Sequence, residues 1–184
     1  MAAKRQHWIY TLGDAALRES AQQWRDRKSS QGKLYELLQT SDQETPAGRL
    51  AVVGNDDVLY VYATASPAGI GLTHKTPTGL AAHLAAEGLD PGHRDLKLFF
   101  ARSGESETGS PSYAEAVYEA LRSRYPQIVV YGFLGDVSPE GFESHKSAGM
   151  AAGETPADLN EGDWNTRRLR ASLNRVQFPK PGKL

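Results

Sequence analysis

Cysteine is absent from the 184 residues of the chain. This absence excludes a disulfide framework, a thiolate metal site and a cysteine nucleophile. Long apolar runs are missing too, since none approaches the roughly 20 residues of a membrane-spanning helix. The first residues are basic but lack the apolar core of a signal peptide. We therefore expect a cytoplasmic protein, or one secreted as an effector without a cleavable signal peptide.

The chain also has almost no net charge. Its 21 lysines and arginines nearly balance 22 aspartates and glutamates, for a net charge of -1. Such a balance gives no general attraction to nucleic acid or to acidic membranes. Residues 163–178 are the exception, and we expect a basic amphipathic helix there that leads into a final short strand. Its arginines leave nucleic-acid binding open as a less favoured alternative; they are Arg167, Arg168, Arg170 and Arg175.

Metal-ligand spacing is also absent. Acidic residues cluster at 56–57, 105–107 and 158–163, but without the regular spacing of a metal-binding loop. Solvated loops explain these clusters, so we expect neither a metal nor any other cofactor.

What the sequence does contain is typical of one globular domain. Hydrophobic residues make up 39% of the chain and charged residues 23%. Apolar runs of strand length alternate with segments of helical spacing, which predicts an α/β fold. The predicted strands are 6–12, 49–53, 58–63, 96–100 and 128–132, and the predicted helices are 14–27, 33–39, 76–88 and 110–121.

This alternation predicts a three-layer α/β/α sandwich with a mainly parallel central sheet, formed by residues 1–184 as a single domain. Residues 135–162 are rich in glycine, proline and acidic residues and predict a long irregular excursion. Residues 179–184 are predicted to form a tail.

Residues 96–121 are the most informative stretch. A buried strand leads into the polar loop 101–110, and Ser110 with Pro111 has the chemistry of a helix start. Loops at the carboxyl ends of parallel strands commonly hold the sites of α/β proteins. The hydroxyl groups of this loop suggest a phosphate site similar to that of flavodoxins. However, Glu105 and Glu107 would repel phosphate, and no glycine-rich nucleotide motif is present.

A hydrolase is the second alternative. Ser103, Asp136 and His145 each follow the carboxyl end of a predicted strand, where they could form a catalytic triad. The sequence around Ser103 is not that of a nucleophile elbow, and three unrelated loop residues are the simpler interpretation.

Residues 49–137 resemble the caspase-like fold of the clan CD cysteine peptidases, especially the self-processing protease domain of RTX toxins and the clostripain-like enzymes. In that family a strand ends in the catalytic histidine, a helix follows, and a second strand ends in the catalytic cysteine. A polar loop, another helix and another strand come next. The matching stretches here are VLYVYATAS, TPTGLAAHLAAEG, LKLFFARSGES, SPSYAEAVYEAL and IVVYGFLGDV.

The resemblance implies the fold without the peptidase chemistry. Thr64 occupies the position of the histidine, and Ala101 that of the cysteine. Alanine has no nucleophile, and threonine is no general base near neutral pH. An engineered replacement of a catalytic cysteine would explain Ala101 but not Thr64.

We therefore expect a pseudoenzyme, of bacterial origin by analogy with its relatives, that binds a protein or peptide on the former active-site face. The residues expected on that face are Thr64, Ser66, Arg102, Ser103, Glu105 and Asp136. The partner and the oligomeric state are not predicted.

Overall fold

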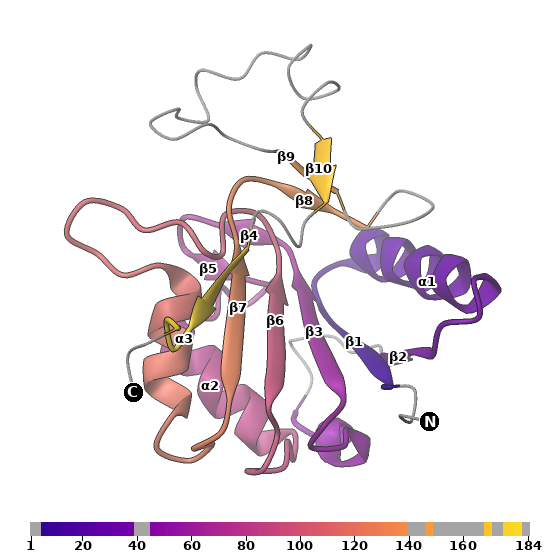
Figure 1. The fold of residues 1–184 in the computed structure, drawn as a ribbon, viewed down its shortest axis with the longest axis horizontal. Coiled ribbons are helices and arrows are strands. Elements are labelled where there is room, and N and C mark those ends of the chain that lie inside the picture. The colour runs from indigo at the N-terminus through magenta and orange to yellow at the C-terminus, as the bar shows by residue number, and fades with distance from the viewer. Residues whose placement is uncertain (1–4, 39–44, 140–145, 149–167, 171–174, 182–184) are drawn as a thin grey trace.

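A computed structural model describes residues 5–38, 45–139, 146–148, 168–170 and 175–181 (Figure 1). Its centre is a six-stranded sheet with the order β11-β7-β6-β3-β1-β2. Five strands run parallel, and only β11 is antiparallel to its neighbour β7. The strands are β1 (His7–Leu12), β2 (Tyr35–Leu38), β3 (Val58–Ala63), β6 (Asp95–Phe99), β7 (Val129–Phe133) and β11 (Arg175–Phe178).

Three α-helices of the described residues cover the two faces of this sheet. Helices α2 (Pro77–Ala86) and α3 (Tyr113–Leu121) pack on one face, where Leu84 and Val117 share a buried cluster with sheet residues. Helix α1 (Ala15–Ser30) packs on the other face through Trp24, whose ring lies 5.1 Å from that of Tyr60 and 4.9 Å from that of Phe99. This arrangement confirms the predicted α/β sandwich with a mainly parallel sheet.

The connections agree with the predicted alternation of strands and helices. Strands β3, β6 and β7 are parallel neighbours, with α2 connecting the first two and α3 the last two. Each helix begins at a side chain that accepts a backbone hydrogen bond. Asp14 caps α1 and Thr76 caps α2, as their sequences indicate. The cap of α3 is Ser112, which accepts from Glu115 N at 3.1 Å, so the helix begins two residues after the predicted cap Ser110.

Two other predicted elements are wrong. Residues 33–39 were expected to be helical, but Tyr35–Leu38 forms β2, because the Tyr35 ring stacks on His7 at 4.5 Å across the parallel pair β1–β2. A short apolar run does not distinguish helix from strand without its tertiary partner. Residues 49–53 were expected to be a strand, but Arg49–Val52 forms the 3₁₀ helix η1.

The carboxyl-terminal third also differs from the prediction. The described part of the predicted basic helix is extended, as the strands β10 (Arg168–Arg170) and β11, of which β11 confirms the predicted final strand. Strands β8 (Val137–Ser138) and β9 (Lys146–Ala148) lie within the predicted excursion and pair with each other, and β9 pairs with β10. Most of residues 135–162 lies outside the described residues, as do half of the predicted tail residues.

Glu87 explains why the chain turns at η1. Its side chain is fully buried and accepts four hydrogen bonds, from the backbone of Ala47 and Arg49, the Arg49 guanidinium and the Tyr10 hydroxyl, at 2.8–3.1 Å. Burial raises the pKa of Glu87, but the hydrogen bonds lower it more, so the pKa lies below its ordinary value. The ionised carboxylate therefore holds the 3₁₀ turn against the end of α2.

We predict that Glu87→Gln lowers the free energy of unfolding by about 2–4 kcal/mol near neutral pH, because the buried donors lose their anionic acceptor. Urea unfolding would measure this change, with Glu36→Gln, an exposed glutamate of β2, as the matched control.

The contribution of Glu87 to the free energy of unfolding depends on pH in a defined direction. Because folding lowers the pKa of Glu87, its contribution is present above the unfolded value near 4.5 and is lost as the pH falls through the folded value. The free energy of unfolding of Glu87→Gln should therefore fall less steeply than that of the wild type below about pH 4.5. Parallel pH profiles would contradict this role.

Candidate functional site

The carboxyl ends of the parallel strands meet at one edge of the sheet, and a cleft of about 570 Å³ opens there beyond β3 and β6. This volume lies within the usual range of ligand sites. One wall is the hairpin formed by β4 (Ala65–Ser66) and β5 (Gly69–Ile70), and the other is the loop 101–112 with the start of α3. The lining residues include Ala65, Ser66, Pro67, Ile70, Phe100, Ala101, Arg102, Ser103, Glu105, Glu107, Pro111, Tyr113 and Ala116.

Ser103 fastens the loop to the sheet. Its side chain is buried, and its hydroxyl donates to Leu98 O at 2.7 Å and accepts from Phe133 N at 2.9 Å. Its carbonyl also accepts from Ala114 N in α3. One serine thus joins β6, β7 and α3, so its hydroxyl is engaged in structure and is not free to attack a substrate.

The next residue, Gly104, allows the loop to approach the sheet closely. A Cβ at Gly104 would stand 2.6 Å from Val176 Cγ2 and 2.9 Å from Gly132 C. Gly104 N also donates to Phe133 O at 2.9 Å. Any larger residue would push the loop away from β7 and change the shape of the cleft.

Charged side chains lie on the same loop. Arg102 has a positive φ of 56° and donates its backbone N–H to Gly135 O. Its Nε lies 3.8 Å from Asp136 Oδ1, which is a loose ion pair between two partly exposed groups. Glu105 Oε1 accepts from Gly135 N at 2.6 Å. The loop and the segment after β7 are therefore tied together at the cleft.

A side chain of α3, Tyr113, holds the segment that follows the β4–β5 hairpin. The Tyr113 hydroxyl donates to Lys75 O at 2.7 Å, and burial raises the pKa of Tyr113 well above its usual value. Its ring meets Phe100 edge-on, with 5.3 Å between the centroids. Gly69 permits the tight turn, since its φ is +138° and a Cβ there would stand 2.5 Å from His74 O.

Ser66 in this hairpin is the exposed hydroxyl of the wall. It donates to Gly69 O at 3.1 Å, accepts from Ala68 N at 3.3 Å and lies 3.3 Å from His74 Nδ1. The two contacts with its own turn are those of a serine that closes a hairpin.

The predicted site residues separate into two groups. Ser66, Arg102, Ser103 and Glu105 line the cleft with Ala101, and Asp136 contacts Arg102. Thr64 is not among the lining residues.

Thr64 and Ala101 follow neighbouring strands, each two residues beyond the register pair Tyr62 and Phe99. The Thr64 hydroxyl lies 3.1 Å from the point where a Cβ on Gly13 would stand, beyond β1. The two positions therefore share an edge, while only Ala101 borders the cleft. His145 lies outside the described residues, so its pairing with Ser103 remains a prediction.

Sequence reasoning missed part of the cleft. Ile70, Tyr113 and Glu107 line it but were not predicted as site residues. Tyr113 could have been inferred from its place at the start of the predicted helix, shortly after the candidate loop 101–110. Ile70 depends on the β4–β5 hairpin, which local sequence does not indicate.

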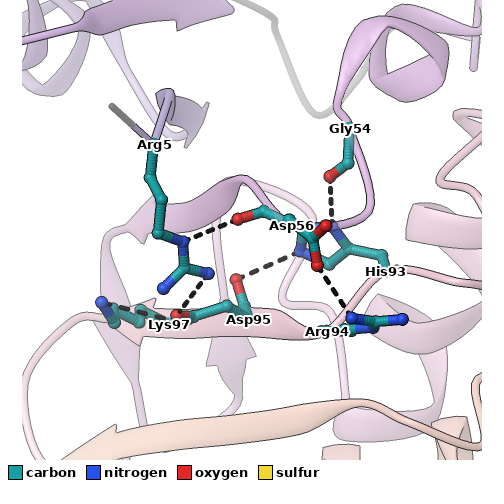
Figure 2. Close-up of polar contacts among 7 residues, drawn as sticks. All are labelled: Arg5, Gly54, Asp56, His93, Arg94, Asp95 and Lys97. Atoms are coloured by element: carbon teal, nitrogen blue, oxygen red, sulfur yellow. Dashed lines mark hydrogen bonds and ion pairs between the residues drawn. The ribbon is translucent and has the colours of Figure 1, made fainter. Parts of the chain in front are cut away.

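A second cluster of polar side chains lies at the amino edge of the sheet (Figure 2). Both ring nitrogens of the buried His93 lie 3.1 Å from carbonyl oxygens, those of Gly54 and Asp95. Arg5 contacts Asp95 Oδ2 at 3.1 Å, and Lys97 lies 3.7 Å from Asp95 Oδ1. Burial lowers the pKa of both His93 and Lys97. These contacts hold the turn before β3 against β6.

The described residues contain neither a metal-binding group nor a membrane-spanning helix. Among them, no three histidine, cysteine, aspartate or glutamate side chains form a group able to hold a metal ion. No described helix is long and apolar enough to cross a membrane.

The fold and the cleft define a class of protein, an α/β sandwich with an open cleft at the carboxyl ends of its parallel strands. A scan against protein-family models gives no match, and a search of the curated proteins gives none either.

We predict that Ser103→Ala lowers the free energy of unfolding by about 1–3 kcal/mol, because Phe133 N and Leu98 O lose their buried partner. Ser106→Ala, an exposed serine of the same loop, should change it by less than about 0.5 kcal/mol. Chemical denaturation of both variants would measure the difference. Equal stability of the two variants would show that the Ser103 bridge does not hold the loop.

Proposed function

We propose that the chain is a caspase-like domain without peptidase chemistry, which binds a peptide segment of a protein partner in the carboxyl-edge cleft. The observation that best supports this proposal is the position of Ala101. It borders an open cleft at the end of the central strand β6, where the resembled family carries its nucleophile. The resemblance also suggests a bacterial toxin or effector system as the setting.

The succession of elements supports this reading. Strand β3, helix α2, strand β6, helix α3 and strand β7 follow in the order of the resembled family, and the three strands are parallel neighbours. No histidine is among the residues that line the cleft in the described part of the chain. Ser66 is the lining residue whose hydroxyl lies near a histidine, 3.3 Å from His74 Nδ1, but this hydroxyl donates its proton to Gly69 O at 3.1 Å.

The shape of the cleft favours a peptide. Its floor contains buried apolar side chains, Ile70 and Phe100, while its rim carries Ser66, Arg102 and Glu107. An extended peptide can place one side chain on the floor while its backbone meets the polar rim. The hydrolase alternative receives no support from Ser103, whose hydroxyl is engaged with two backbone groups.

We predict that selection of a displayed library of random dodecapeptides on the purified protein yields binders that are not cleaved. Ala101→Leu should weaken their binding about tenfold or more, because the added side chain occupies the cleft. The matched control is Ala15→Leu at the exposed start of α1, on the other face of the sheet. Anisotropy of labelled peptides would measure binding, and mass spectrometry would detect cleavage.

Two outcomes would contradict this proposal. Cleavage of a selected peptide that disappears in Ser66→Ala or Ser103→Ala, with folding intact, would establish a hydrolase. Binding that Ala101→Leu leaves unchanged would place the partner elsewhere on the molecule.

A further inference from the structure

Two carboxylates at the cleft have no cationic partner among the described residues. Glu105 lines the cleft, and among the described residues its carboxylate accepts one hydrogen bond, from Gly135 N. Glu107 lines the cleft as well and is exposed, and its side chain makes no hydrogen bond or ion pair with the described residues. Both lie on the loop that Ser103 and Gly104 fix against the sheet, so their backbone positions are set before any ligand arrives.

Arg102, the one basic side chain among the described lining residues, does not balance them. Arg102 is already paired with Asp136 at 3.8 Å, across the segment that follows β7. Acidic side chains therefore outnumber basic ones at this end of the cleft. The electrostatic potential there favours a cationic group, and opposite charge on a ligand would accelerate its approach.

The other end of the cleft is apolar. Ile70 and Phe100 are almost fully buried, and Ala116 faces the same space from α3. The Tyr113 ring is held in place by its hydroxyl bond to Lys75 O. A ring that cannot rotate away provides a fixed wall for an apolar side chain.

From this juxtaposition we infer that the cleft recognises a peptide in which an apolar residue and a lysine or arginine lie next to each other. This inference rests on the proposed peptide-binding function. The apolar side chain occupies the floor, and the cation lies against Glu105 and Glu107. Neutral and acidic peptides lose the ion pair or meet like charge, so the cleft discriminates by charge as well as by shape.

The test uses three fluorescein-labelled hexapeptides. The first is Gly-Ser-Leu-Lys-Ser-Gly, the second has glutamate in place of lysine, and the third has serine in place of leucine. We expect the first to bind, and the other two to bind about tenfold or more weakly by fluorescence anisotropy. Added salt should weaken the binding of the first peptide, because exposed charges are screened.

Two variants test whether the preference for the lysine peptide arises at the cleft. Glu107→Gln should weaken the lysine peptide about two- to fivefold and reduce its salt dependence, since one exposed ion pair is lost. Glu36→Gln, on the strand at the far edge of the sheet, should change neither.

The outcomes separate this inference from the function on which it rests. Equal affinity for the lysine and glutamate peptides, with both weakened by Ala101→Leu, would overturn the charge preference and leave the peptide cleft standing. Preference for lysine that Glu107→Gln does not reduce would also overturn the inference. Binding of no hexapeptide would overturn it too, and failure of the library selection would then reject the proposed function.

Discussion

The close packing of Ser103 and Gly104 against β7 is the constraint on which the cleft depends. The Ser103 hydroxyl bridges the carbonyl of Leu98 and the N–H of Phe133, and its carbonyl accepts from the first turn of α3. Gly104 is small enough to lie against Gly132. The loop therefore leaves β6, folds back onto the sheet and presents the next residues outward. Without this fixed crossing, Arg102, Glu105 and Glu107 would have no defined positions.

The two edges of the sheet use their polar groups differently. At the amino edge, His93, Arg5 and Asp95 are engaged with one another or with backbone carbonyls, so they stabilise the turn before β3. At the carboxyl edge, Glu107 and an apolar floor face a common space, and the Glu107 side chain makes no hydrogen bond or ion pair with the described residues, while Glu105 is bonded only to Gly135 N there. Polar groups that are satisfied internally contribute to stability, whereas unpaired groups beside a cleft are available to a ligand. This contrast is why the proposed site lies at the carboxyl edge.

Much of the architecture could be predicted because its signals are local. Runs 58–63 and 96–100 are rich in aromatic and β-branched or large apolar residues and form β3 and β6, and Thr76 with Pro77 marks a helix start. The errors occur where tertiary contacts decide. Residues 35–38 become a strand because Tyr35 stacks on His7, and residues 49–52 become a 3₁₀ turn because Glu87, distant in sequence, accepts their hydrogen bonds.

The site was predicted in part for the same reason. Residues on the loop after β6 follow from the strand–loop–helix order, so Arg102, Ser103 and Glu105 were found. The role of Ser103 was not, because a hydroxyl that bridges two backbone groups looks the same in sequence as a free one. Thr64 shares the edge but not the cleft: it and Ala101 lie at equivalent register positions of β3 and β6, so the difference arises in the loops beyond the two strands, which local sequence does not indicate.

The central claim is that a peptide partner occupies the carboxyl-edge cleft, and an amide NMR titration tests it most directly. A peptide selected on the wild-type protein would be added to isotope-labelled protein, and the amide shifts followed along the chain. The account predicts the largest changes at residues 65–70 and 101–113, with residues 54–57 and 93–97 at the amino edge unchanged. Largest changes at the amino edge, or on the outer faces of the helices, would contradict it.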